Sequence, residues 1–132
     1  MYDDAMSGVK RHLVGYSYPS HFTFIGELPT GVATSGLSPK MDHLVCFLGG
    51  NLALGATEGK TLEQARKKGW TIRQQDDLDL AEALTQSCVE MYNITATGLA
   101  PEIVRFNTDT SKNEDITIKP NDRYGRTLVR LT

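Results

Sequence analysis

The pattern of hydrophobic and polar positions predicts a chain made mainly of helices, with short extended segments between them. Apolar residues recur at four-residue spacing at Ala5, Val9 and Leu13, after an acidic start. This spacing predicts an amphipathic helix that ends near Gly15. Residues 21–28, HFTFIGEL, alternate between apolar and polar or small positions, and this period of two predicts a strand.

Residues 41–54 are apolar on nearly every face and predict a helix that is buried all round. Ser38 followed by Pro39 indicates the helix start, because the hydroxyl can cap free amides and proline fills a position that needs no donor. Gly49 and Gly50 would each weaken an isolated helix by about 1 kcal/mol relative to alanine. Close packing against another backbone is the expected reason for keeping them.

The second half of the chain carries the same two kinds of pattern. Residues 61–68 predict a short solvated helix and residues 69–77 a polar connector. Residues 77–92 predict an amphipathic helix with Cys88 on its buried stripe. Two short strands are expected further on, at residues 102–106 and 116–118. The fold class expected from these elements is mainly α, with a few short strands.

Charge and composition narrow the classes of partner. The 132 residues include 14 basic and 16 acidic side chains, for a formal net charge of -2, so a nucleic-acid-binding surface is not expected. No apolar run is long enough to span a bilayer, and membrane attachment would therefore need an anchor upstream of this chain.

Motifs for phosphate binding, metal binding and nucleophilic catalysis are weak. No glycine-rich phosphate loop follows a predicted strand. His43 and Cys46 share one helix face at a spacing that suits zinc, but His12 and His21 lie in segments without ligand spacing, so no metal site is expected in this chain. Cys46 also lies in an apolar run, which disfavours the reactive thiolate.

Polar side chains on otherwise apolar elements remain as candidates for a functional site. Asp42 and His43 enter the apolar segment, and Glu102 follows a proline ahead of a predicted strand. The structural alternative for His43 is a hydrogen-bonded core histidine, and the alternative for Glu102 is a helix-terminus or loop carboxylate paired with Arg105 or Lys119.

The cysteines and one asparagine also leave alternatives open. Cys46 and Cys88 fit one disulfide in an oxidising compartment or two buried thiols, and their number alone does not separate these alternatives. Asn93-Ile94-Thr95 is an acceptor sequence for N-glycosylation, which also arises by chance.

Several longer motifs together carry a resemblance. FTFIGEL, KMDHLVCFLGG, CVEMY, GLAPEIVRFN and IKPNDR, in that order, resemble the class I α-1,2-mannosidases of glycoside hydrolase family 47, especially the fungal type of the endoplasmic reticulum. The resemblance runs from Tyr2 to Arg123. It implies that residues 1–123 are a fragment of a catalytic domain and that residues 124–132 are a divergent C-terminal tail.

The resemblance implies a fold and an activity. The expected fold is part of an (α/α)7 barrel, in which paired helices surround a pocket that a β-hairpin plugs. The fold class is then mainly α with a small β-hairpin. The expected activity is that of an inverting, calcium-dependent hydrolase, which trims terminal α-1,2-linked mannose from high-mannose N-glycans in the endoplasmic reticulum or another secretory compartment. Inversion requires an acid and a base about 6.5–9.5 Å apart, with water beside the base.

Four residues take roles from the matching motifs. His43 of MDHLVCF matches a histidine that lines the subsite of the mannose being cleaved, and Glu102 of APEIV matches a substrate-binding carboxylate. Cys46 and Cys88 match the cysteines of the family disulfide, which would contribute about 4 kcal/mol in the chain-entropy description. In a secretory compartment Asn93 would be open to glycosylation.

The same resemblance shows what the chain lacks. The general acid and a second catalytic aspartate of the family lie upstream of these motifs, and the calcium-binding threonine lies downstream. After Arg123 the sequence departs from the segment that leads to the catalytic base. The chain alone is therefore predicted to be inactive and poorly soluble. The alternatives are a non-catalytic mannose-binding or quality-control relative, and a plain helical interaction domain in which His43 and Glu102 point away from any shared cavity.

Overall fold

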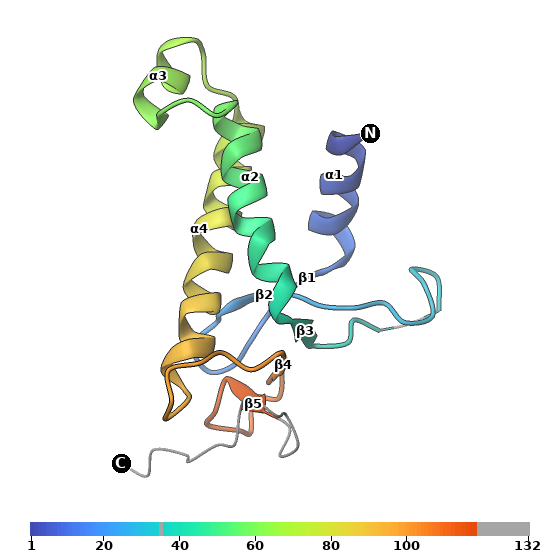
Figure 1. Ribbon diagram of the computed structural model, residues 1–132. Coiled ribbons are helices and arrows are strands. Elements are labelled where there is room, and N and C mark those ends of the chain that lie inside the picture. The colour runs from blue at the N-terminus through green and yellow to red at the C-terminus, as the bar shows by residue number, and fades with distance from the viewer. Residues whose placement is uncertain (35, 119–132) are drawn as a thin grey trace.

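The computed structural model describes residues 1–34 and 36–118, and these form helices with two small antiparallel sheets (Figure 1). The mainly α prediction is therefore confirmed. The elements, in chain order, are α1 (Tyr2–His12), β1 (Val14–Tyr16), β2 (Thr23–Ile25), β3 (Lys40–Asp42), the 3-10 helix η1 (His43–Cys46), α2 (Phe47–Thr57), α3 (Leu62–Lys67), α4 (Ile72–Asn93), β4 (Ile103–Phe106) and β5 (Ile116–Ile118).

Helices α2 and α4 lie side by side and run antiparallel, with α3 in the connection at their far end (Figure 1). Gln74 near the start of α4 donates from Nε2 to the carbonyl of Ala56 near the end of α2, over 2.8 Å. At the other end of the pair, a disulfide joins Cys46 to Cys88, with a Cα–Cα distance of 5.9 Å.

The two sheets lie at the base of this helix pair (Figure 1). Strands β1 and β2 form a hairpin in which Val14 pairs with Ile25. The second sheet has the order β3-β4-β5, and its middle strand pairs Val104 with Met41 on one side and with Ile118 on the other. Strands predicted near residues 102–106 and 116–118 are thus confirmed.

The hydrophobic core forms where the lower half of α4 meets both sheets. Phe24 of β2 and Phe106 of β4 stack with ring centroids 4.8 Å apart. The buried cluster draws on β2, β3, α4 and β4, and its members are Phe24, Ile25, Met41, Leu84, Cys88, Met91, Val104 and Phe106. The segments that carry the candidate site residues either contribute residues to this core or directly follow or precede ones that do.

The helix predicted over residues 41–54 begins later than its apolar pattern indicates. Residues 40–42 instead form β3, and η1 follows before α2 starts at Phe47. Ser38, which was expected to cap the helix, exchanges two backbone hydrogen bonds with Glu27, of 2.8 and 3.0 Å. Pairing with distant strands overrides the local helix signal here.

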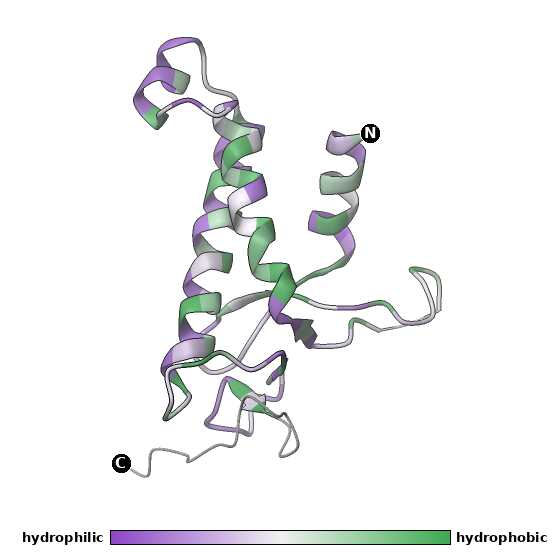
Figure 2. Cartoon of the chain, viewed as in Figure 1, coloured by the Kyte–Doolittle hydropathy of each residue, from purple (hydrophilic) through white to green (hydrophobic). Residues whose placement is uncertain are grey.

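The prediction that this helix is buried all round is also wrong. Leu44 just before α2, and Phe47 and Leu54 within it, are 67%, 72% and 61% exposed. They share one side of the helix because their spacings of three and seven residues return to the same face. Figure 2 shows hydrophobic residues along most of α2, whereas hydrophilic and hydrophobic residues alternate along α4.

Only one of the two central glycines of α2 is explained by close packing. A Cβ atom on Gly49 would lie 2.9 Å from Oγ1 of Thr85 and 3.3 Å from the carbonyl oxygen of Ala81, both on α4. A Cβ atom on Gly50 would meet nothing within 4 Å. The expectation of close packing is confirmed for Gly49 and wrong for Gly50.

Helix α4 begins earlier than predicted, at Ile72 inside the supposed polar connector over residues 69–77. Thr71 and Gln74 form a capping box. The backbone N–H of Gln74 donates to the Thr71 hydroxyl (3.2 Å), and the backbone N–H of Thr71 donates to Oε1 of the Gln74 side chain (3.0 Å). This threonine-x-x-glutamine signal offsets the polar composition of the first turn.

The first helix ends at His12 and not near Gly15. The residues after it turn into β1, because their backbone groups pair with β2. No helix in the described ranges combines the length and hydropathy needed to cross a bilayer. The tail predicted at residues 124–132 lies outside the described residues.

Candidate functional site

The two predicted substrate-binding residues are neighbours at one end of the β3–β4 strand pair. His43 follows β3 directly, and its amide donates to the carbonyl oxygen of Glu102 over 2.8 Å. This bond extends the pairing of β3 with β4, in which Asp42 faces Ile103. Segments far apart in the sequence, MDHLVCF and APEIV, are therefore joined at the backbone.

The His43 side chain is held by a residue that the sequence analysis did not assign to the site. Its Nε2 atom lies 2.8 Å from the hydroxyl of Tyr92 on α4, and the two rings meet edge to face with centroids 5.6 Å apart. Both side chains keep contact with solvent, since His43 is half-buried and Tyr92 is 40% exposed. The imidazole is therefore held in one orientation but is not buried in the core.

Tyr92 could have been found from the helix register. In an antiparallel pair of helices, a step forward on one helix corresponds to a step backward on the other. The disulfide between Cys46 and Cys88 sets the register, so His43, one turn before Cys46, falls opposite Tyr92, one turn after Cys88. The contact could therefore have been predicted from the spacing of these residues together with the Cys46–Cys88 disulfide that the resemblance implies.

Glu102 has an exposed side chain at the start of the loop–strand junction. No ion pair of the described residues involves it, so the alternative pairing with Arg105 is not seen, and Lys119 lies outside the described residues. Pro101 before it is fully buried. The buried proline thus fixes the backbone while the carboxylate faces solvent.

The other acidic residue beside His43 is engaged elsewhere. Lys40 bridges two carboxylates, with Nζ 2.8 Å from Glu27 and 3.1 Å from Asp42. Hydrogen bonds to Glu27 and then to Asp42 raise the pKa of Lys40 above its usual value. Asp42 is therefore committed to a lysine on its own strand, which leaves His43 and Glu102 as the polar groups with open faces.

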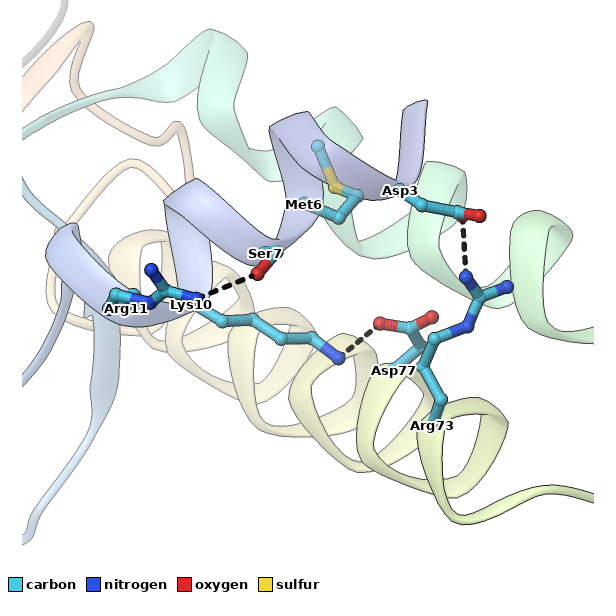
Figure 3. A pocket seen from close by; sticks show the side chains of 7 residues that line it. All are labelled: Asp3, Met6, Ser7, Lys10, Arg11, Arg73 and Asp77. Carbon is cyan, nitrogen blue, oxygen red and sulfur yellow. Dashed lines mark hydrogen bonds and ion pairs between the residues drawn. The ribbon is translucent and has the colours of Figure 1, made fainter. Parts of the chain in front are cut away.

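A hollow of about 340 Å³ lies elsewhere, between α1 and α4 (Figure 3). Its lining residues are Asp3, Met6, Ser7, Lys10, Arg11, Arg73 and Asp77. Asp3 pairs with Arg73 over 2.7 Å, and Lys10 pairs with Asp77, so the charges largely satisfy one another. Tyr92 is 15 to 19 residues further along α4, roughly 22–29 Å away. This hollow is not part of the candidate site.

Metal binding is not supported by the residues that the structure describes. Among residues 1–34 and 36–118, no group of three or more His, Cys, Asp or Glu side chains is arranged to hold an ion. Calcium prefers six to eight oxygen ligands. The candidate site has one carboxylate, an imidazole and a phenol, which can exchange hydrogen bonds with a neutral hydroxyl-rich ligand.

Comparison with known proteins identifies relatives of one kind. A sequence profile of glycosyl hydrolase family 47 matches residues 1–127. A mannosyl-oligosaccharide 1,2-alpha-mannosidase of Candida albicans is 56% identical over 126 residues, a match that covers 94% of this chain and 22% of that protein. An endoplasmic reticulum enzyme of the same description from Schizosaccharomyces pombe is 54% identical over 114 residues, covering 86% of the chain and 22% of that protein.

A solved structure is similar in fold. An alpha-1,2-mannosidase from Trichoderma reesei matches with a TM-score of 0.57 and 23% sequence identity, over 76% of this chain and 18% of that one. The chain therefore spans about a fifth of the length of the proteins that it matches. The profile match extends past residue 123, into the segment predicted to be a divergent tail, and the proposed boundary stays a prediction.

Proposed function

The chain belongs to glycosyl hydrolase family 47, and from that premise we propose that it forms one wall of the sugar-binding pocket of an α-1,2-mannosidase. The enzyme would act on high-mannose N-glycans in the lumen of the endoplasmic reticulum. One observation supports the proposal: a backbone hydrogen bond between His43 and Glu102 joins the two motifs to which we assign substrate binding.

His43 and Glu102 would bind hydroxyl groups of the terminal mannose. With Nε2 of His43 engaged by Tyr92, the other ring nitrogen is the atom available to a sugar hydroxyl. The exposed carboxylate of Glu102 can accept hydrogen bonds from two adjacent hydroxyls. The wall would thus orient the sugar ring for groups supplied by other parts of the enzyme.

The chemical step needs groups beyond this wall. Inverting hydrolysis uses one carboxylic acid to protonate the leaving oxygen and a second carboxylate to activate water on the opposite face. Glu102 supplies a single carboxylate. The proposal therefore assigns binding to this chain and predicts that the 132-residue polypeptide alone does not release mannose.

The helix pair fits a place in a larger helical barrel. Helices α2 and α4 are packed antiparallel, and the exposed apolar side of α2 is the surface on which a neighbouring helix of an (α/α)7 barrel would pack. The fold likeness to the Trichoderma reesei enzyme supports this arrangement.

Calcium, which the family uses, does not fit the described residues. The site has one open carboxylate and no cluster of oxygen ligands. We therefore route no step of the proposed function through a metal ion bound by this chain.

A chimera tests the proposal. This chain would replace the matching segment of the Candida albicans enzyme, to which it is 56% identical over 126 residues. His43→Ala and Glu102→Gln are each expected to lower kcat/KM for an α-1,2-linked mannooligosaccharide about 10- to 100-fold, because each removes hydrogen bonds made to the sugar. His12→Ala and Glu114→Gln are the matched controls and should retain activity.

Three results would contradict the proposal. Unchanged kcat/KM in both the His43 and Glu102 variants would remove the binding role. Release of mannose by the isolated chain would show that the chemistry does not need other parts of the enzyme, and glycan binding without turnover by the chimera would favour a non-catalytic relative.

A further inference from the structure

We propose that Asn93 carries an N-linked glycan, and that the glycan is attached before the C-terminal end of α4 folds. The proposal rests on the lumenal location given in the proposed function. Asn93-Ile94-Thr95 is the one Asn-x-Ser/Thr sequence of the chain, and its middle residue is not proline.

The acceptor side chain is accessible at the end of α4. Asn93 is the last residue of the helix, is exposed, and its Nδ2 atom lies 3.3 Å from a carboxylate oxygen of Glu90 on the same surface. Met91 faces the core, and two residues further along a helix is a rotation of roughly 200°. Asn93 therefore points away from the core, and a bulky glycan there displaces no packed side chain.

The surroundings also leave room for a glycan. The end of α4 lies at the periphery of the molecule (Figure 1). The four residues at 96–99 in the following turn are exposed as well. A glycan at Asn93 would extend from this turn into solvent.

The hydroxyl of the same acceptor sequence is closed to an enzyme once the chain is folded. Thr95 is only 7% exposed, and its Oγ1 atom lies 3.0 Å from the carbonyl oxygens of both Tyr92 and Leu99. Its backbone is held too, since the Thr95 amide donates to Tyr92 and its carbonyl accepts from Gly98. The hydroxyl at the third position, which defines the acceptor sequence, is thus engaged in hydrogen bonds within the turn.

This contrast sets an order of events. In the folded chain the asparagine is open but its recognition partner is buried, so the complete acceptor sequence is presented only while this turn is unformed. Cys88 lies five residues before Asn93 and ties α4 to Cys46, so closing the disulfide holds the helix that ends at the acceptor. Glycan attachment is therefore expected before the disulfide-bonded helix pair is complete.

The sugar donor of the transfer step is a lipid-pyrophosphate-linked oligosaccharide. The side-chain nitrogen of Asn93 forms a bond to the anomeric carbon of the first sugar. The bond from that carbon to the pyrophosphate oxygen breaks, the lipid pyrophosphate leaves, and the amide nitrogen gives up one proton.

Occupancy is tested by translating the whole chain, behind a cleavable signal peptide, in the presence of microsomes. The expected result is a single glycan, seen as a mobility shift that peptide N-glycosidase removes. Asn93→Gln and Thr95→Ala should abolish the shift, Thr95→Ser should keep it, and Asn113→Gln, an exposed asparagine outside any acceptor sequence, should leave it unchanged.

The absence of a shift in the parent chain, while a control glycoprotein is modified in the same microsomes, would overturn the proposal. The signal peptide supplies entry to the lumen, and the readout does not depend on hydrolysis. A failure here is therefore distinct from a failure of the proposed mannosidase function.

The order of events is tested with a purified transferase and lipid-linked oligosaccharide. The oxidised, folded chain and the reduced, alkylated chain are presented at equal concentration, with a peptide of residues 90–97 as the positive control. The unfolded chain should be modified at least tenfold more extensively. Equal modification of both forms would overturn the proposed order.

Discussion

At the scale of single residues, the candidate site depends on how one imidazole is held. His43 is tied through its backbone to Glu102 and through its ring to Tyr92. The motifs in the sequence identified His43 and Glu102 because each lies in a distinctive run of residues. Tyr92 also lies in such a run, CVEMY, but that motif brought no role for it, and its contact with His43 follows from the packing of two helices, which local patterns do not determine.

The Tyr92→Phe variant isolates this contact. Loss of the hydroxyl removes the hydrogen bond to His43 while keeping the aromatic ring, so the free energy of unfolding is expected to fall by about 0.5–1.5 kcal/mol. Urea unfolding measures the change, and Tyr16→Phe, at a 60% exposed tyrosine of β1, is the control. Equal effects of the two variants would contradict the role assigned to the His43–Tyr92 bond.

A second residue-scale feature is the half-buried carboxylate of Asp115, which joins the β1–β2 turn to the loop before β5. Burial by itself raises the pKa of Asp115, but hydrogen bonds from the Ser17 hydroxyl (2.6 Å) and the Ser20 amide (2.9 Å) outweigh it. The pKa of Asp115 therefore lies below its ordinary value of 3.8. The sequence shows only an aspartate in a polar loop and gives no sign of this connection.

The lowered pKa of Asp115 predicts how the stability of the fold depends on pH. A carboxyl group whose pKa is lower in the folded state stabilises the fold above its unfolded-state pKa, and this contribution is lost as the pH falls through the folded-state pKa. Asp115→Asn should therefore cost about 1 kcal/mol at pH 7. The difference from the parent chain should shrink on acidification below about pH 4.

Urea unfolding of both chains between pH 7 and pH 2 provides the measurement. Glu114→Gln, which changes an exposed carboxylate at the neighbouring position, is the control and should follow the parent. An Asp115→Asn chain with the same pH dependence as the parent would show that Asp115 does not contribute in this way.

At the scale of elements, the sequence predicted most helices and strands but misplaced several of their ends. The spacing of apolar residues reflects which face of an element is buried. This spacing correctly located the amphipathic part of α4 and the strands β4 and β5. The start of α2 was wrong because residues 40–42 pair with β4, and pairing with a distant strand leaves no local signal. The start of α4 was missed although its capping box, Thr71 with Gln74, was readable in the sequence.

The two glycines of α2 provide a matched test of helix packing. Gly50→Ala should stabilise the chain by about 0.5–1 kcal/mol, because alanine is the better helix former and its Cβ meets nothing within 4 Å. Gly49→Ala should destabilise it by about 1–3 kcal/mol. Its Cβ would press on Thr85, whose hydroxyl is bound to the Ala81 carbonyl at 2.7 Å, and on that carbonyl itself.

Thermal or urea unfolding of the two alanine variants measures the difference directly, since both changes add one methyl group to adjacent positions of the same helix. Opposite signs support the close approach of α2 to α4 at Gly49. Stabilisation by both substitutions would mean that the helices are further apart than the structure has them.

At the scale of the whole molecule, the main departure from the sequence-based expectation is an apolar face without cover. The all-round apolar pattern of α2 predicted burial, and burial is a property of everything that packs around a helix. In this chain the core and α4 cover one side, where Leu52 and Ala56 are buried, and leave Leu44, Phe47 and Leu54 in solvent. The pattern is therefore explained if α2 belongs to a larger helical assembly, as the proposed barrel requires.

The exposed apolar face of α2 leads to a prediction about self-association. In the isolated chain, the double variant Phe47→Gln and Leu54→Gln should reduce self-association with little loss of stability, because both side chains are already exposed to water. Leu52→Gln, which places a polar group at a 1% exposed position of the same helix, should instead unfold the chain. Sedimentation velocity measures association, and urea unfolding measures stability.

The same double variant should behave in the opposite way in the chimera with the Candida albicans enzyme. There the face would be buried against a neighbouring helix, so two glutamines in place of Phe47 and Leu54 should lower the unfolding temperature and the yield of active enzyme. A chimera that tolerates both glutamines without loss would mean that this side of α2 also faces solvent in the whole enzyme. In that case the uncovered face would not mark the place where the rest of a barrel packs.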